Sequence, residues 1–312
     1  MQVFCSTVIP TVGRPTLSRA VESVLNQTFT AENFEVIVVN DSGQPLPKTD
    51  WQRSARVQII NTYRRERSVA RNTGAAIAKG RYLHFLDDDD WIVPDAWQTL
   101  WTLAETSDAA WLYGSSQLVD RQGKPIIQLH HGLNGNCFVQ VMAGEWIPLQ
   151  ASLIEGKTFF TVAGFNPLIS GPEDVDLLRR IALHSDIAGT QRIVAHIAWG
   201  EQGSTTDYDH HPEMSRWARE IILNLPGVFT RMRTSATSSY WHGRIVRAYL
   251  TSMVWNLQRK NLFRAASRAM FGCAELVLAS PHFLSPSFWR AVTRPYVSET
   301  FLKGFQAIAV ST

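Results

Sequence analysis

Short apolar segments alternate with segments of helical periodicity through the first third of the chain. The first apolar segment, residues 3–9, ends at Pro10 and is followed by apolar residues at helical spacing, which predicts a strand, a loop and a helix. The same pattern predicts strands at residues 36–39, 57–60, 82–86 and 109–113, and helices at residues 68–78 and 97–104. Such alternation indicates an α/β fold with a mostly parallel sheet flanked by helices.

The pattern changes beyond residue 119. Residues 120–124 predict a turn between two strands, and residues 138–147 form an apolar segment that fits either a helix or a strand. From about residue 213 the spacing of apolar residues is helical, with basic residues nearby. We therefore divide the chain into an α/β domain at residues 1–210 and a basic, mainly helical C-terminal region at residues 211–312.

Composition and cysteine count narrow the class of protein. With 312 residues, 45% of them hydrophobic and 18% charged, the chain can bury a substantial core, which excludes intrinsic disorder. Cys5, Cys137 and Cys273 lie far apart without CxxC spacing, so we expect a cytoplasmic protein without a disulfide framework or a thiolate zinc site. The first apolar segment stops at Pro10, and none of the later apolar runs is long enough to span a membrane. We therefore expect neither a signal peptide nor a membrane span.

The charge is unevenly distributed along the chain. Between Arg231 and Lys303 there are eleven Lys or Arg and two Glu, so this stretch carries +9 and the rest of the chain, within a total of +3, carries −6. One interpretation is a peripheral contact with an anionic membrane or a phosphate-bearing acceptor, and the other is a solvated helical face. Aromatic residues in this region fit either interfacial anchors or core packing: Trp241, Trp255, Phe263, Phe271 and Trp289.

Four consecutive aspartates, Asp87 to Asp90, follow the strand predicted at residues 82–86. Several hard oxygen ligands at one chain reversal suit Mg²⁺ or Mn²⁺ better than zinc or copper, and their mutual repulsion favours a bound cation. An acidic run taken alone is more often a solvated loop, and Pro94 suits a helix that begins at Asp95. The run by itself leaves both interpretations open.

Other polar residues are predicted at the same edge of the sheet. Thr11 and Asp41 also follow strands, and ligands of parallel α/β sheets bind beyond the carboxyl ends of the strands. Asp41 precedes Ser and Gly and is therefore also a typical turn former. Arg67 and Arg71 lie in the helix before the acidic strand, where a guanidinium suits phosphate oxygens or an ordinary surface position.

A second acidic cluster, Glu173, Asp174 and Asp176, opens an apolar helix after a break at residues 170–172. Asp174 is a candidate general base. Capping and compensation of the helix dipole explain carboxylates at a helix start equally well. The segment alone favours the capping interpretation.

Several familiar catalytic motifs are missing from the sequence. It contains no GxSxG elbow and no Walker phosphate loop, and no cysteine carries a local signature of an activated thiol. The adjacent pairs His130–His131 and His210–His211 lack the i, i+4 spacing of a helical zinc motif. These absences disfavour serine hydrolases, P-loop enzymes and helical zinc proteases.

Taken together, these segments resemble the inverting family-2 glycosyltransferases of the GT-A fold over roughly residues 1–206. VIPTVGRP at residues 8–15 resembles the opening strand and nucleotide-contacting loop of that family, and EVIVVNDSG at residues 35–43 resembles its second strand. The most specific stretch, RSVARNTGAAIAKGRYLHFLDDDDW at residues 67–91, resembles its helix, strand and DxD motif. VAGFNPLISGPEDVDLLRRI at residues 162–181 resembles its acceptor-side segment with an EDxD-like element.

The resemblance implies metal-dependent transfer of a sugar from a nucleoside-diphosphate donor, with a UDP-sugar expected, to a hydroxyl of a glycan or lipid-linked acceptor. It makes Asp174 the catalytic base and Asp89 and Asp87 the ligands of Mn²⁺ or Mg²⁺, supported by Asp90. It places Asp41 on the nucleobase and Asp88 at the variable middle position of the motif. The implied donor-binding residues are Pro10, Thr11, Arg14, Asp41, Arg71, Asp87 and Asp88, and the implied acceptor-binding residues are Trp91, Gly164, Phe165 and Glu173.

Two positions depart from the family pattern. Ala163 replaces the first glycine of the usual pair, and Glu201 stands where a histidine often ligates the metal, with His196 five residues earlier. The resemblance therefore leaves Glu201, His196 or neither as the remaining metal ligand. The QxxRW signature of processive synthases is also absent from the sequence.

Two other functions remain compatible with the sequence. A sugar nucleotidyltransferase also holds a metal with carboxylates beneath a nucleotide, but its glycine-rich, Lys-containing loop does not follow the first strand here. A non-catalytic sugar-nucleotide or glycan-binding module is the other alternative, because a fold by itself does not establish turnover. Retention of both Asp89 and Asp174 favours the enzyme.

Overall fold

The computed structural model describes residues 3–30, 33–63, 66–120, 122–198, 210–228, 230, 232 and 238–294. Contacts between residues divide the chain into two compact units. The first comprises residues 1–137 and 147–218, and the second comprises Phe138–Trp146 and Arg219–Thr312. The domain boundary expected at residue 210 stays a prediction, and the segment Phe138–Trp146 belongs by its contacts to the second unit.

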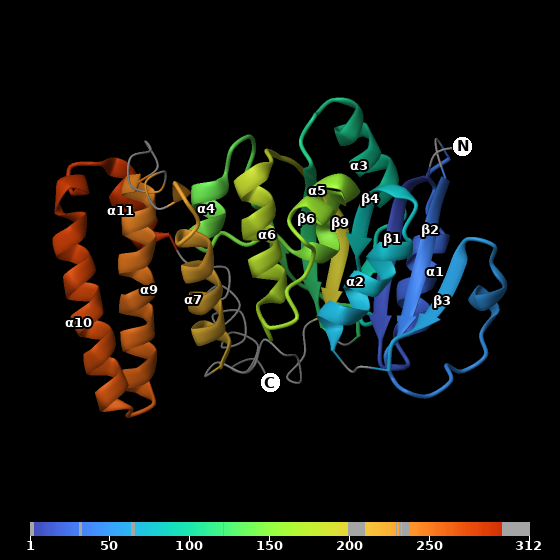
Figure 1. The fold of residues 1–312 in the computed structure, drawn as a ribbon, viewed down its shortest axis with the longest axis horizontal. Coiled ribbons are helices and arrows are strands. Elements are labelled where there is room, and N and C mark those ends of the chain that lie inside the picture. The colour runs from blue at the N-terminus through green and yellow to red at the C-terminus, as the bar shows by residue number, and fades with distance from the viewer. Residues whose placement is uncertain are drawn as a thin grey trace. The chain divides into compact units, whose positions relative to one another are not determined.

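A nine-stranded sheet forms the centre of the first unit, in the order β3-β2-β1-β4-β8-β6-β9-β5, with β7 paired to β6 (Figure 1). The strands are β1 (Val3–Thr11), β2 (Asn33–Asn40), β3 (Val57–Asn61), β4 (Gly80–Phe85), β5 (Trp91–Ile92), β6 (Trp111–Val119), β7 (Pro125–Leu129), β8 (Ser152–Glu155) and β9 (Ile187–Ala198). Strands β1 to β4 pair in parallel, as do β6 and β9. The α/β fold class is therefore confirmed. The turn expected between two strands at residues 120–124 is also confirmed, since it joins the antiparallel pair β6 and β7. The antiparallel pairs of β5 and β8 were not predicted.

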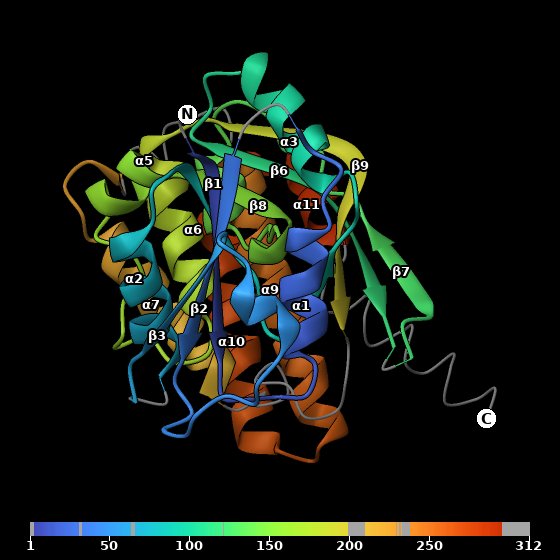
Figure 2. The ribbon, with the colours of Figure 1, turned by 90° about the vertical axis from the view of Figure 1, so that its right-hand side faces the viewer.

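Helices cover both faces of the parallel strands. The helices of this unit are α1 (Leu17–Leu25), α2 (Arg67–Ile77), α3 (Ala96–Glu105), α5 (Gly156–Thr161) and α6 (Glu173–His184). Helix α7 (His210–Leu223) begins in this unit and ends in the second. Successive strand side chains point to opposite faces. Ile9 packs with α1 and α3, whereas Val8 lies against Gly74 of α2, where an added Cβ would be 2.4 Å from its methyl carbon. In Figure 2, α2 and α1 accordingly lie on opposite sides of β1 and β2.

The register of the parallel strands brings several chain reversals to one edge of the sheet. Thr11 pairs with Asn40, and Val8 pairs with Phe85, so β1, β2 and β4 end at the same edge. The residues that follow these ends include Asp41 and the four aspartates. The expectation that these polar residues share one edge is therefore confirmed, and the candidate site lies there.

The second unit is helical where the structure describes it. It contains α4 (Phe138–Met142), α9 (Ser238–Gln258), α10 (Leu262–Ala279) and α11 (Pro286–Thr293), so the apolar segment at residues 138–147 begins with a helix. Buried Glu145 accepts a hydrogen bond from the Tyr240 hydroxyl and lies 3.5 Å from Arg244 and 3.3 Å from Arg294. These contacts fasten the segment to α9. None of the described helices combines the length and apolar character needed to cross a membrane.

Candidate functional site

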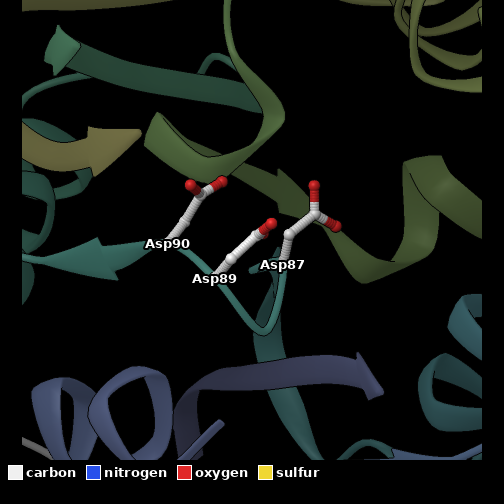
Figure 3. Close-up of side chains that lie close together, drawn as sticks. All are labelled: Asp87, Asp89 and Asp90. Carbon is white, nitrogen blue, oxygen red and sulfur yellow. The ribbon is translucent and has the colours of Figure 1, made fainter. Parts of the chain in front are cut away.

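The acidic run forms a tight turn between β4 and β5. The Asp90 amide donates to the Asp87 carbonyl at 3.1 Å, which closes the turn. One carboxylate oxygen from each of Asp87, Asp89 and Asp90 lies within 4.8 Å of the others, and Figure 3 shows the three side chains rising from one side of the turn. The sequence predicted Asp87 and Asp89 as ligands and Asp90 as a supporting residue, and the geometry brings all three carboxylates together.

Asp88 is not part of this three-carboxylate cluster and is buried. Its carboxylate accepts hydrogen bonds from the Thr11 hydroxyl at 2.5 Å and from Arg14 Nη1 at 2.7 Å. The same Arg14 nitrogen lies 3.1 Å from Asp89. Asp88 therefore holds the acidic turn against the end of β1. The sequence did not predict this role, because the resemblance makes Asp88 the variable middle residue of the motif.

The crowding of these carboxylates shifts their pKa values. Burial and the neighbouring Asp87 charge raise the pKa of Asp89 to about 6, and burial with the same neighbour raises the pKa of Asp90 well above its usual range. Burial alone would raise the pKa of Asp87 as well, but the Arg71 guanidinium outweighs it and lowers this pKa. A divalent cation would offset the repulsion, and an all-oxygen donor set fits Mg²⁺ or Mn²⁺.

Arg71 connects the acidic turn to the start of α6. Its side chain is 4% exposed, and its two terminal nitrogens lie 2.6 Å from Asp87 and 2.9 Å from Glu173. Arg67 adds a more exposed contact to Glu173 at 3.3 Å. The Arg71 guanidinium is thus buried between two carboxylates of the protein, and its expected contact with the donor stays a prediction.

Glu173 and Asp174 are neighbours with different surroundings. The Glu173 side chain is 3% exposed and anchors the first turn of α6 to Arg71, and its expected contact with an acceptor stays a prediction. Asp174 is only partly buried, and its carboxylate accepts a hydrogen bond from the Val175 amide at 2.7 Å. The anchored Glu173 therefore fixes the helix turn that carries Asp174.

The turn at residues 163–165 is fixed against α2. Ala163 and Gly164 both have positive φ values, 62° and 64°. The Asn72 side chain donates to the Phe165 carbonyl at 2.8 Å and accepts from its amide at 2.9 Å, and an added Cβ on Gly164 would lie 2.7 Å from the Asn72 oxygen. Phe165 is 1% exposed and packs on Phe85, so it supports the turn, and its expected acceptor contact stays a prediction.

Trp91 lies between charged and aromatic neighbours. The Arg19 guanidinium is 3.7 Å from the centre of the Trp91 ring, and the His196 ring stacks on it at 5.2 Å. Arg19 also donates to the Asp89 carbonyl at 2.8 Å. Trp91 and His196 border a hollow of about 280 Å³. His196 is not part of the three-carboxylate cluster, and Glu201 lies outside the described residues.

The end of β2 holds Asp41 in a fixed orientation. Asp41 is buried, and its carboxylate accepts hydrogen bonds from the Thr62 hydroxyl at 2.7 Å and the Glu66 amide at 2.6 Å. Its amide donates to the carbonyl of Thr11, which follows Pro10 in β1. Asp41 therefore lies beside the loop expected to contact the nucleotide, and its contact with a nucleobase stays a prediction.

Three residues of the site were not singled out from the sequence. Gln150, in the short 3₁₀ turn η2 (Leu149–Ala151), donates to Asp87 at 3.0 Å, and Arg19 and Asn72 make the contacts given above. Gln150 and Arg19 come from segments without a recognisable motif, whereas Asn72 lies within the stretch at residues 67–91 that resembles the family most specifically. Arg19 and Asn72 lie in helices whose periodicity was clear, but their partners are tens of residues away along the chain.

Comparisons with known proteins agree with this geometry. The model of the family "Glycosyl transferase family 2" matches residues 6–163. An uncharacterized glycosyltransferase of Rickettsia felis is 28% identical over 198 residues, which cover 62% of this chain and 32% of that protein. The poly(ribitol-phosphate) beta-N-acetylglucosaminyltransferase TarP of Staphylococcus aureus is 30% identical over 115 residues, 35% of either protein. The matched segment thus spans about a third of the length of these relatives.

Solved structures show the same fold. The crystal structure of S. aureus TarS residues 1–349 in complex with UDP-GlcNAc superposes with a TM-score of 0.57 at 14% sequence identity and covers 85% of this chain and 90% of that one. A second crystal structure of S. aureus TarS residues 1–349 gives a TM-score of 0.57 at 12% identity. At these identities the likeness shows the fold alone, and it confirms the GT-A fold class expected from the sequence.

Proposed function

Because this chain belongs to glycosyl transferase family 2, we propose that it is an inverting enzyme that moves a sugar from a UDP-sugar to a hydroxyl of a glycan or lipid-linked acceptor. The observation that carries the proposal is the connection of the Asp87, Asp89 and Asp90 cluster, through Arg71, to the helix turn that holds Asp174. The TarS complex with UDP-GlcNAc and the name of TarP support a UDP-sugar donor and an acceptor in a cell-envelope polysaccharide.

The donor end of the proposed site lies at the acidic turn. Asp89, Asp87 and Asp90 would hold Mn²⁺ or Mg²⁺, which when bound neutralises charge on the departing nucleoside diphosphate. Arg14 is about half exposed beside Asp89 and supplies a second positive group for the phosphates. The position of Asp41 at the end of β2 supports its proposed contact with the nucleobase.

The acceptor end lies at the start of α6. Asp174 takes the proton of the acceptor hydroxyl, whose oxygen then attacks the anomeric carbon from the side opposite the diphosphate. The bond between this carbon and the phosphate oxygen breaks with its electron pair on the leaving group, so the configuration inverts in one displacement. Glu173 and Phe165 hold the surrounding turns, and the half-buried Trp91 remains a proposed acceptor contact at the edge of the hollow described above.

Two variants separate the proposed roles. Asp174→Asn should lower turnover by about a hundredfold to ten-thousandfold, the usual contribution of a general base, and leave donor affinity nearly unchanged. Asp89→Ala should weaken Mn²⁺-dependent binding of UDP in calorimetry. Turnover of Asp174→Asn close to that of the unmodified protein would exclude Asp174 as the base, and unchanged UDP affinity in Asp89→Ala would leave the acidic run a solvated loop.

We also propose that the enzyme is cytoplasmic and associates peripherally with the inner face of the cell membrane. The excess of basic residues between Arg231 and Lys303 supports this location. A lipid-linked acceptor would be held at such a surface.

A further inference from the structure

Helix α10 packs on α9 through its smallest side chains. Ala265, Gly272 and Ala279, spaced seven residues apart, are buried. The approach is close, because an added Cβ on Gly272 would lie 3.3 Å from the Cβ of Tyr249 in α9. Burial of this face therefore uses little of the apolar area that the helix carries.

The large apolar side chains of α10 lie on its other face. Phe263, Met270 and Val277 also recur every seven residues, and they are 85%, 63% and 73% exposed. Leu262 and Leu278, at 68% and 61% exposed, flank them. We call these five residues the outer face of α10. Water-soluble helices normally bury their large apolar residues and expose small or polar ones, so this arrangement is inverted.

The charges in the stretch of sequence that carries the outer face are predominantly positive. Between Arg259 and Arg294 the only carboxylate is Glu275, which is paired with His242 at 2.7 Å. The basic residues of this stretch are Arg259, Lys260, Arg264, Arg268, Arg290 and Arg294. A second copy of the chain would bring the same positive charges to the contact, whereas anionic lipid headgroups complement them.

We propose that the outer face of α10 inserts into the interfacial layer of an anionic lipid bilayer. An 18-residue helix is about 27 Å long, and it lies parallel to the surface with its large apolar side chains among the acyl chains. Arg264 and Arg268 then lie at the level of the headgroups. This inference concerns the second unit alone and holds whether or not the proposed glycosyl transfer is correct.

Vesicle flotation with the full chain tests the proposal. The protein should float with vesicles of phosphatidylcholine and phosphatidylglycerol, bind phosphatidylcholine alone more weakly, and lose the difference at high salt. Phe263→Ser and Met270→Ser should each weaken binding about tenfold or more. Phe160→Ser is the matched control, since Phe160 is 55% exposed on α5 of the first unit and should have no effect. Arg264→Gln should weaken binding about fivefold, and only to the anionic vesicles.

Cys273 offers an independent readout of insertion. It is exposed on α10, while Cys5 and Cys137 are buried, so a polarity-sensitive dye can be placed on it selectively. Its emission should shift to the blue when anionic vesicles are added and should not shift in Phe263→Ser. Equal binding of Phe263→Ser and the unmodified protein, or no preference for anionic vesicles, would overturn the proposal. A dimer in analytical ultracentrifugation that Phe263→Ser dissociates would also overturn it, in favour of a second copy.

Discussion

Replacement of Arg71 by methionine should destabilise the protein strongly. Arg71 is 4% exposed and forms ion pairs of 2.6 Å with Asp87 and 2.9 Å with Glu173, whose side chain is 3% exposed. Removal of one partner leaves the other charge buried without full compensation, which typically costs about 3–5 kcal/mol. Arg67 stays near Glu173, so we expect a loss near the lower end, about 3 kcal/mol of unfolding free energy.

Urea unfolding measures this loss against a matched control. Arg67→Met removes a cation 3.3 Å from the same Glu173 oxygen, but Arg67 is 42% exposed, so the variant should lose less than about 1 kcal/mol. Adding Glu173→Gln to Arg71→Met should restore at least about 1 kcal/mol, because it removes the unpaired charge. Equal losses for Arg71→Met and Arg67→Met, or a double variant no more stable than Arg71→Met, would refute the reasoning.

The same position should affect turnover separately from stability. Arg71→Lys keeps the positive charge. It replaces the planar guanidinium, which reaches both carboxylates, with a compact ammonium group. The first turn of α6 then loses its fixed position, so kcat should fall while the KM for the donor changes little. A variant with wild-type kcat would show that Asp174 does not depend on Arg71.

Three further predictions concern other residues. Burial lowers the pKa of His84 to about 4, below about 6.5 in the unfolded chain, so unfolding takes up a proton and stability falls by up to about 3 kcal/mol as pH drops from 6.5 to 4; in urea unfolding, His84→Gln should flatten this dependence, and an unchanged slope would contradict the assignment. Ala163→Gly should raise the unfolding free energy by about 1 kcal/mol because Ala163 has a φ of 62°, and a decrease would argue against strain there. Asp88→Ala should lower the unfolding free energy by about 1–3 kcal/mol through its bonds to Thr11 and Arg14, yet bind UDP and Mn²⁺ better than Asp89→Ala; equal calorimetric losses in the two variants would contradict the separate roles.

Local periodicity predicted β1 to β4, their common edge and the start of β6, because apolar residues in each segment alternate with clear breaks or helices. Strand β8 was missed because it has only four residues and takes its place between β4 and β6 by pairing with distant strands. The local turn signal at residues 120–124 did predict the antiparallel pair β6 and β7, whereas the position of β8 depends on contacts between distant segments.

The resemblance to a family located the acidic turn and the start of α6, and the structure refined how they are joined. Arg71 and Glu173 are 102 positions apart, and neither residue's sequence context indicates that it is buried. For this reason the sequence did not indicate that Glu173 and Phe165 support the turns at residues 163–165 and at the start of α6, and their expected acceptor contacts stay predictions. The burial of Asp88 was missed for the same cause, since its partner Thr11 lies 77 positions earlier.

Incubation with a panel of nucleotide sugars and Mn²⁺ tests the central claim most directly. Slow hydrolysis suffices for detection, so the acceptor need not be known. We predict release of UDP from at least one UDP-sugar by the unmodified protein, with the rate strongly reduced in Asp89→Ala. Tight binding of UDP-sugars without any release, or release of pyrophosphate in place of UDP, would contradict the account.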